Sequence, residues 1–513
     1  AARRNRGPTM ILPTTSQNGK PVEQRTLFVR PRQRQGKVPL RVKLLQGFGT
    51  VPGQHKDWAF NTLLLLFYSQ ILGLPATVAA FALALSLVID AVSDPLVGGL
   101  SDNFRSRLGR RHAFMLASIV PTGLSVYALF QPPQDLNQTL LATWVITFTV
   151  LTRLSFTFFS VPYAALAAEL SEHYEERTTI MTYRIALGWL VGVVFIFCMY
   201  SLMFTSTAEH TNGLLDPRHY AGFGLMLSVL MMGWMTITTL GTLNQIPSLP
   251  QPTEGMPPIR LVSLLTQTLS ALQNRNFRLL FLATLLSAAI NGTGQVFDIY
   301  MNLYFWQFGT DDIRWFSFAL LGAAMAFASV GWLQTLFEKH QIMMYAMSLL
   351  MVIAMLKVGL RFLQVWPENG EPNLLPMLVV HASIMAYGGS LVLIMFASMI
   401  ADIVDEQEHL TAMRQEGTFS AGVSLAGKST TGLGLIIGGL LLDWVIALPA
   451  GATPETITSD VVIRLGVVDG LLVPAFYLIP ILLIRNYRLD RHQLSRLQQQ
   501  IRQRRNDALD QEA

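Results

Sequence analysis

The stretch that decides the fold reads Asp90-Ala91-Val92-Ser93-Asp94-Pro95 and continues from Gly98 as Gly98-Gly99-Leu100-Ser101-Asp102-Asn103-Phe104-Arg105-Ser106-Arg107-Leu108-Gly109-Arg110-Arg111. Every residue before it, from Trp58 to Ile89, is uncharged. A helix places Asp90 and Asp94 on one face, roughly 5–6 Å apart. A charge in hydrocarbon costs at least about 2.5 kcal/mol, so acids within a membrane span indicate function. We therefore expect a spanning helix with a site for Na⁺ or H⁺, followed by a basic loop.

The composition is that of a membrane protein. Hydrophobic residues make up 51% of the 513 residues and charged residues only 13%, whereas soluble domains carry about 25% charge. The net charge of +5 comes from residues in short gaps between apolar segments and at the chain ends, which argues against nucleic-acid binding. The single cysteine, Cys198, lies in an apolar run, so neither a disulfide nor a zinc site is expected. No nucleophile–base set appears, and we expect neither an enzyme nor a cofactor.

Apolar runs of about twenty residues predict twelve transmembrane helices and an all-α membrane protein. The expected spans are 54–73, 76–100, 113–131, 139–168, 180–205, 221–246, 277–307, 315–337, 341–366, 374–401, 418–447 and 466–485. A proline-rich segment between the sixth and seventh spans predicts a linker. The expected organisation is an N-terminal arm (1–45), a six-helix half (46–246), a linker (247–275), a second six-helix half (276–485) and a tail (486–513).

The distribution of Lys and Arg predicts the orientation. The arm, the linker, the tail and the loops on their side hold most of the basic residues, whereas the opposite loops hold only Arg218, Arg314 and Arg464. The positive-inside rule therefore places both termini in the cytoplasm. We expect a multi-pass protein of a bacterial inner membrane, monomeric, in contact with membrane lipid and acting on a small-molecule solute. Six plus six helices around a linker is the architecture of the major facilitator superfamily.

Several motifs together resemble one family, the glycoside–pentoside–hexuronide:cation symporters of the major facilitator superfamily. The stretch from Asp90 to Arg111 carries the first of them. The others are Gly47-Phe48-Gly49, Phe67-Tyr68-x-x-x-Leu72-Gly73-Leu74, Ser160-Val-Pro162-Tyr163-Ala-Ala-Leu166-x-x-Glu169-Leu170, Glu176-Arg177-Thr178, Tyr183-Arg184 and Asp402-Ile-Val-Asp405…Arg414-x-Glu416-Gly417…Lys428. The resemblance covers roughly residues 45–485 and implies cation-coupled transport by alternating access.

The resemblance implies a cation site formed by Asp90, Asp94 and Thr157. In the family, two acids of the second helix and a hydroxyl of the fourth bind the coupling cation, and all three residue types are present here. Carboxylate and hydroxyl oxygens are the ligands that a hard cation prefers. The alternative is that the acids only pair with a neighbouring Arg or Lys. The sequence does not distinguish Na⁺ from H⁺.

The family's solute pocket is only partly matched. Its first-helix acid corresponds to Gln54 in an ungapped alignment or to Asp57 with a small gap, and its fourth-helix acid and Trp are replaced by Ser160 and Ala164. The remaining matching positions are Arg184, Ser424 and Lys428. Arg184 and Lys428 are cations at membrane depth, so each is expected to need an anionic partner. The most plausible partners are Asp90, Asp94 and Asp298.

A polar face is expected on the seventh span. Asn291, Gln295, Asp298 and Asn302 follow one another at spacings of four, three and four residues, which places them on one side of a helix. This face either packs against another helix or lines the cavity and replaces the missing acid, with Asp298 contacting the solute. Both interpretations remain open.

Charged residues at the cytoplasmic side suggest an electrostatic gate. In the first half they are Asp102, Arg105, Arg107, Arg110, Arg111 and Arg177, and in the second half Asp402, Asp405 and Arg414. Ion pairs between the two halves would hold the inside closed. The alternative is that these arginines only fix the topology.

The preferred functional hypothesis is Na⁺- or H⁺-coupled symport of a sugar or glycoside. One alternative is cation-coupled transport of a non-sugar solute such as a lysolipid, because the acid that would bind a sugar is missing. The other is a non-transporting sensor built on the same fold, although a scaffold has no reason to keep acids in hydrocarbon.

Overall fold

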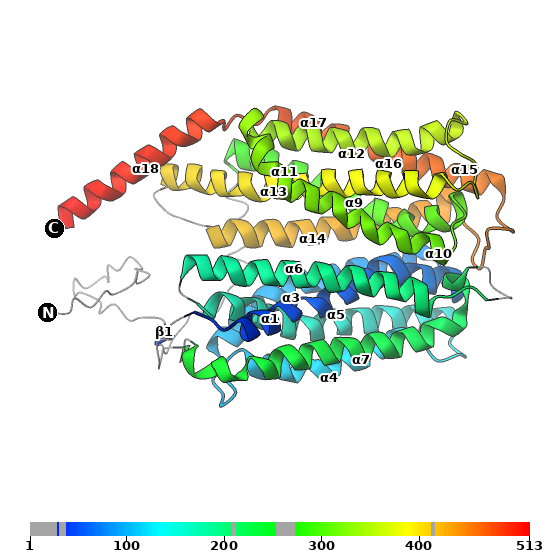
Figure 1. Cartoon of the computed structure of the whole chain (residues 1–513), viewed down its shortest axis with the longest axis horizontal. Helices are drawn as coiled ribbons and strands as arrows, with labels where there is room; N and C mark the ends of the chain where they lie inside the picture. The colour runs from blue at the N-terminus through cyan, green and yellow to red at the C-terminus, as the bar shows by residue number, and fades with distance from the viewer. Residues whose placement is uncertain are drawn as a thin grey trace.

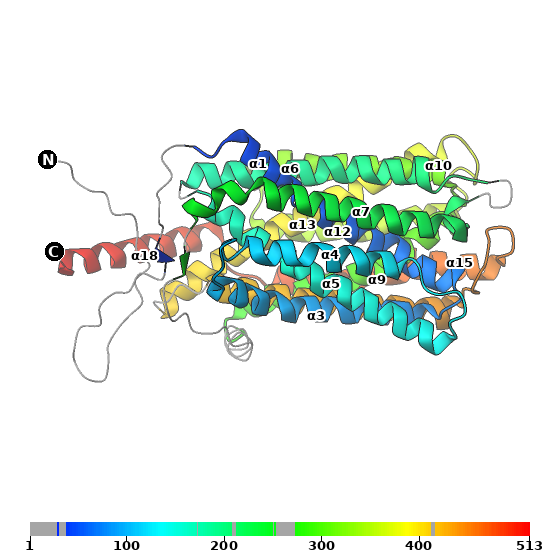
Figure 2. The same cartoon turned by 90° about the horizontal axis from the view of Figure 1, so that it is seen from below.

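The computed structural model describes residues 28–29, 37–171, 173–207, 212–249, 251–252, 272–411 and 416–512. Long helices run side by side along one axis and form an elongated bundle (Figures 1 and 2). Helix α18 (Arg491–Glu512) projects from one end, called here the terminal end, and α10 (Thr310–Ile313) and α15 (Ser459–Val467) lie at the other, the loop end (Figure 1). In the described part of the chain the strands are β1 (Phe28–Val29) and β2 (Gln251–Pro252), which pair antiparallel.

The N-terminal half contains one interrupted helix followed by five long ones. The interrupted helix consists of α1 (Leu40–Phe48), α2 (Val51–Trp58) and π-helical turns at Ala59–Leu64 and Phe67–Ile71. The long helices are α3 (Ala76–Asn103), α4 (His112–Leu129), α5 (Gln138–Glu169), α6 (Tyr174–Cys198) and α7 (Pro217–Gly241).

The C-terminal half begins at α9 (Arg275–Tyr300), which a π-helical turn extends to Phe305. The next helices are α11 (Leu320–Leu336), α12 (Lys339–Phe362), α13 (Leu374–Thr411) and α14 (Glu416–Leu440), and a π-helical turn continues α14 to Ile446. The last span begins with α15, continues through a π-helical turn (Val468–Leu472) and α16 (Val473–Ala475), and ends with α17 (Leu478–Arg485).

The structure confirms an all-helical, multi-pass architecture. Eleven helices of the described residues are long and apolar enough to cross a membrane. They correspond to eleven of the twelve expected spans, and the remaining one, 54–73, is the interrupted helix of α2 and its two π-helical turns.

Two predicted boundaries are wrong. The first helical segment begins at Leu40, so the boundary at residue 45 falls inside α1. Because α1 carries Arg41 and Lys43 beside the buried Val42, it is amphipathic and is missed by a search for apolar runs. The last span begins at Ser459 rather than 466, since its first turns hold Asp460 and Arg464.

The two halves meet closely between α3 and α14. A Cβ added at Gly439 of α14 would lie 2.7 Å from the Cβ of Ala80, and one at Gly432 would lie 3.2 Å from the backbone of Ala84. Small residues at such positions let helix backbones approach closely in a membrane. This contact holds the two halves together from the middle of the bundle toward the loop end.

Polar contacts also join the halves at the loop end. The Asp443 carboxylate accepts hydrogen bonds from the backbone N–H groups of Ala76 (3.0 Å) and Thr77 (2.8 Å). The hydroxyls of Ser69 and Tyr300 lie 2.7 Å apart, and Asn212 donates to the Phe308 carbonyl at 2.9 Å. The structure is therefore closed between the halves at the loop end.

Candidate functional site

The structure brings the three residues of the predicted cation site together with a lysine from the other half. Asp90 and Asp94 lie on α3, and the Thr157 hydroxyl of α5 donates to Asp90 Oδ1 at 2.9 Å. Lys428 Nζ of α14 lies 2.8 Å from Asp90 Oδ2 and 2.6 Å from Asp94 Oδ2. The lysine therefore bridges both carboxylates across the boundary between the two halves.

Further charges of the N-terminal half surround this cluster. Lys56 Nζ lies 2.9 Å from Asp57 Oδ1, and the Arg153 guanidinium lies 3.9 Å from Asp57 and 3.8 Å from Asp90. Lys56 also lies over the ring of Phe156, 4.9 Å from its centroid. The three carboxylates Asp57, Asp90 and Asp94 thus face three cations, Lys56, Arg153 and Lys428, and the cluster is neutral when all six are ionised.

Lys428 was expected to contact the solute, but its ammonium lies at the two acids of the predicted cation site. Its ammonium occupies the space between Asp90 and Asp94 that a coupling cation would use. A bound cation and the ammonium would therefore compete for the same carboxylate oxygens. The prediction that Lys428 pairs with Asp90 or Asp94 is confirmed, and the structure adds that one ammonium bridges both acids.

The expected solute contacts of the N-terminal half lie on α2, α5 and α6. Gln54 is exposed and its side chain lies beside Gly188 and Gly192 of α6. Asp57 is about half exposed and Ser160 is partly buried. Ser424 lies on α14, one turn before Lys428.

The prediction that Arg184 needs an acidic partner is wrong. Its guanidinium stacks on the ring of Tyr163, with 4.5 Å between Cζ and the ring centroid, and its Nε donates to the Tyr163 hydroxyl at 3.0 Å. The aromatic face takes the place of a carboxylate because a planar guanidinium binds a π system favourably.

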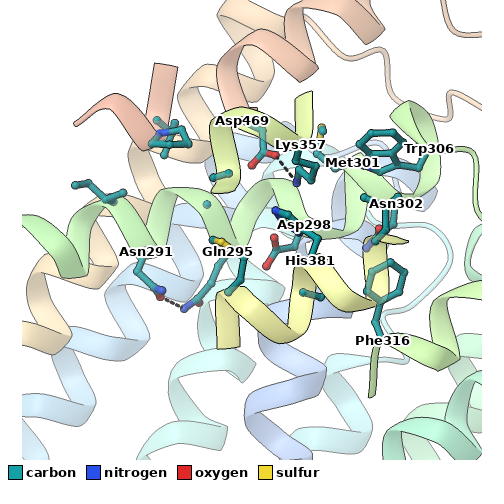
Figure 3. Close-up of a pocket in the computed structure, with 18 of the residues that line it drawn as sticks. Asn291, Gln295, Asp298, Met301, Asn302, Trp306, Phe316, Lys357, His381 and Asp469 are labelled. Carbon is teal, nitrogen blue, oxygen red and sulfur yellow. Dashed lines mark hydrogen bonds and ion pairs between the residues drawn. The ribbon is translucent and has the colours of Figure 1, made fainter. Parts of the chain in front are cut away.

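A second polar group lines a cavity of about 400 Å³ inside the C-terminal half (Figure 3). Asn291, Gln295, Asp298 and Asn302 of α9 contribute one wall, with Gln295 donating to Asn291 at 2.6 Å. Across the cavity, Lys357 of α12 lies 3.4 Å from Asp469. His381 Nε2 of α13 lies 3.2 Å from the Ile353 carbonyl oxygen, and Figure 3 shows its ring beside Asp298.

A smaller cavity of about 230 Å³ adjoins this one between the halves. Trp58, Asn61 and Tyr200 line it from the N-terminal half, whereas Gln295, Asp298 and Asn302 line it from α9. The polar face of α9 therefore lines two cavities, as the second interpretation of its spacing predicted. Sequence reasoning assigned no site to Lys357 or Asp469; Lys357 shares one apolar span with Arg361, and Asp469 lies in another.

The charges proposed as a gate pair within each half. At the end of α3, Asp102 accepts from Arg111, and both Arg110 and Arg111 lie 2.7 Å from Glu169 at the end of α5. In the second half, Lys339 lies 2.7 Å from Asp402. Among the described residues, these ion pairs each join an acid and a base of the same half.

The remaining gate residues make local contacts. Arg177 Nε donates to the Ser171 carbonyl at 2.7 Å, and Asp405 accepts from Gln498 of α18 at 2.9 Å. Arg105 and Arg107 are exposed in the loop after α3, and Arg414 lies outside the described residues.

Comparisons with known proteins give the family. Residues 45–491 match the family described as MFS/sugar transport protein. The inner membrane symporter YicJ of Escherichia coli is 24% identical over 455 residues, which cover 86% of this chain and 90% of YicJ. The isoprimeverose transporter of Lactiplantibacillus pentosus is 21% identical over 387 residues, covering 75% of this chain and 76% of the transporter.

Solved structures agree on the fold. The nucleoside transporter NupG superposes with a TM-score of 0.54 at 14% identity, covering 88% of this chain and 99% of NupG. These matches confirm the predicted fold class and the prediction that the chain is a transporter rather than an enzyme. The chain belongs to the MFS/sugar transport family of the major facilitator superfamily.

Proposed function

We propose that this protein is a secondary active symporter that couples the transport of a sugar or glycoside to Na⁺ or H⁺ by alternating access. Family membership and the symporters among its relatives support the reaction class. The observation that carries the proposal is the bridge from Lys428 of the C-terminal half to Asp90 and Asp94 of the N-terminal half.

The bridge gives a physical account of coupling. Two carboxylates one helical turn apart repel each other unless a positive charge lies between them. In this structure the Lys428 ammonium supplies that charge. A Na⁺ ion or a proton bound at Asp90 and Asp94 would supply it instead and release Lys428. Since Lys428 belongs to the other half, cation binding changes the attraction between the halves, which is the movement that alternating access requires.

Polar groups on both sides of the boundary between the halves support a polyhydroxylated solute. Asp57 and Arg184 lie on the N-terminal side, and Asn302 and Asp298 lie on the C-terminal side. Carboxylates accept hydrogen bonds from hydroxyls, amides both accept and donate them, and charged acceptors bind hydroxyls more strongly than neutral ones. Ser160 and Gln54 add neutral partners on the N-terminal side.

The membrane placement follows from the charge pattern. The protein is an integral multi-pass membrane protein. The basic loops that end at Arg110 and Arg111 support a cytoplasmic terminal end, so that both termini are cytoplasmic. An inner bacterial membrane, a monomeric state and contact with lipid complete the proposal.

Transport into vesicles tests it. The protein would be reconstituted and supplied with a panel of neutral sugars and glycosides, with the Na⁺ gradient and the pH gradient imposed separately. Uphill accumulation driven by one gradient, and its loss in Asp90→Asn and Asp94→Asn, is the expected result. Accumulation of a lysolipid but no sugar would support the alternative solute class, and no cation-driven accumulation of any solute would support a sensor.

A further inference from the structure

The cavity inside the C-terminal half differs in charge from the Asp90–Asp94 cluster. Among the described residues that line it, the ionised groups are the two carboxylates Asp298 and Asp469 and one ammonium, Lys357. The imidazole of His381 also lines the cavity, with its Nε2 3.2 Å from the Ile353 carbonyl oxygen, and it adds no charge in its neutral form. The cavity therefore carries one negative charge that its own walls do not balance.

The unbalanced carboxylate is that of Asp298. Lys357 lies 3.4 Å from Asp469, and no ion pair or hydrogen bond to the Asp298 carboxylate occurs among the described residues. The Asp298 side chain is exposed to the cavity rather than packed in the core. Figure 3 shows Asp298 beside His381, on the wall that α9 contributes to the cavity. An acceptor with free lone pairs thus faces the open space.

The other groups around Asp298 are suited to a sugar ring. Asn302 and Gln295 lie one turn to either side of it on α9 and supply amides. Trp58 lines the adjoining cavity from the other half and offers an indole face. Carboxylate, amide and indole together bind hydroxyls and the apolar face of a ring. The volume of about 400 Å³ lies within the range of small-molecule sites.

This cavity and the cation cluster lie at different positions along the long axis of the helix bundle. Helix α9 runs from the terminal end toward the loop end, and Asp298 lies near its last turn. Asp94, in contrast, lies in the half of α3 that runs toward the terminal end, well after the start of that helix at Ala76. The solute ring and the coupling cation would therefore occupy different layers of the bundle.

We propose that this cavity is the ring-recognition site of the transporter and that Asp298 selects neutral pyranosides against their C6 carboxylates. The proposal rests on the symport function proposed above. A carboxylate brought beside Asp298 would meet a like charge, and Lys357, the ammonium that lines the same cavity, is already paired with Asp469, so such a contact opposes binding. The family pattern has an acid at the fourth-helix position that Ser160 occupies here. Asp298 would supply the missing carboxylate.

Matched pairs of probes test the selectivity. Purified protein would be titrated with the methyl glycosides of glucose and galactose and with those of glucuronate and galacturonate, by thermal shift and by tryptophan fluorescence. The neutral member of at least one pair should bind about 10-fold or more tightly than its carboxylate. Asp298→Asn should reduce this ratio about 10-fold, whereas Asp298→Glu should keep it. Asp311→Asn, an exposed acid at the loop end of the same half, is the control and should change nothing.

Several outcomes would overturn the inference. They are tighter binding of the carboxylates by the unaltered protein, an unchanged ratio in Asp298→Asn, and no binding of any of the four probes. Each is separate from the symport function, because cation-driven uptake of another solute would still be measured in vesicles. Loss of all cation-driven uptake in the unaltered protein would instead contradict the symport function itself.

Discussion

Lys428 and Asp94 belong to opposite halves of the molecule, and the lysine Nζ lies 2.6 Å from the carboxylate Oδ2. The same ammonium lies 2.8 Å from Asp90, so one cation of the C-terminal half satisfies two acids of the N-terminal half. The pair is at once part of the predicted cation site and a contact between the two moving bodies. Breaking this ion pair is therefore the first test of whether cation binding is coupled to movement of the two halves.

Replacing Lys428 by Met should destabilise the protein in cation-free buffer and make it depend on the coupling cation. Both acids would lose their shared partner, which we expect to cost about 2 kcal/mol, less than for a fully buried pair because the side chains of Lys428 and Asp94 are about one-third exposed. Added Na⁺, or lower pH if the proton is the coupling ion, should restore the melting temperature. Uphill transport should be lost.

Lys339→Met is the matched control for this experiment. Lys339 also pairs with an acid, since its Nζ lies 2.7 Å from Asp402 Oδ2. Both residues belong to the C-terminal half and lie outside the cation cluster. Its loss should lower the melting temperature in a way that added cation does not restore. Equal rescue of both variants by the cation would argue against competition at Asp90 and Asp94.

Thr157→Val should weaken cation binding without abolishing transport. The hydroxyl donates to Asp90 at 2.9 Å and is fully buried, so its removal costs about 1 kcal/mol, a typical neutral hydrogen bond. We expect the half-maximal cation concentration for uptake to rise about 5-fold. Thr143→Val, on the exposed face of the same helix, should leave it unchanged. Equal cation dependence of Thr157→Val and the unaltered protein would remove Thr157 from the site.

The sequence predicted the helices well because hydrocarbon imposes long apolar runs that are visible without tertiary information. It failed at Leu40, where the chain is helical but amphipathic, since such a segment lies partly outside the hydrocarbon. The face of α9 was also predictable, because a helix fixes which of Asn291, Gln295, Asp298 and Asn302 point the same way.

Contacts between distant segments were predictable only in part: the sequence named Asp90 and Asp94 as plausible partners of Lys428, but not that one ammonium bridges both. Lys428 and Asp94 are 334 residues apart, and only packing of α14 against α3 brings them together. Lys357 shares its apolar span with Arg361, and no pattern in the sequence pairs either of them with Asp469 of another span. For Arg184, no sequence pattern favoured the ring of Tyr163 over a carboxylate.

A larger side chain in the contact between α14 and α3 should oppose closure of the two halves at the loop end. A side chain at Gly439 would meet Ala80 Cβ at 2.7 Å and the Thr77 backbone at 3.0 Å, so Gly439→Val forces the helices apart. We expect a cysteine placed at Ala76 in a Cys198→Ser background to react faster with a membrane-impermeant thiol reagent, and transport to fall. Gly331→Val, where a Cβ meets nothing within 4 Å, is the control, and equal labelling in both variants would contradict the prediction.

The loop before α7 should give the protein an acid-sensitive contact outside the membrane spans. Hydrogen bonds from Arg218, whose Nε and backbone N–H lie 2.9 Å and 3.0 Å from Asp216 Oδ1, hold the pKa of Asp216 well below its usual range. Because the folded protein lowers this pKa, the contact stabilises fully above the unfolded value of about 3.9 and is lost as the pH falls further. Asp216→Asn should therefore lower the melting temperature at pH 7 and lose less stability than the unaltered protein between about pH 4 and pH 2. Asp311→Asn, an exposed loop-end acid, is the control, and parallel pH profiles for Asp216→Asn and the unaltered protein would show that Asp216 does not titrate as this geometry requires.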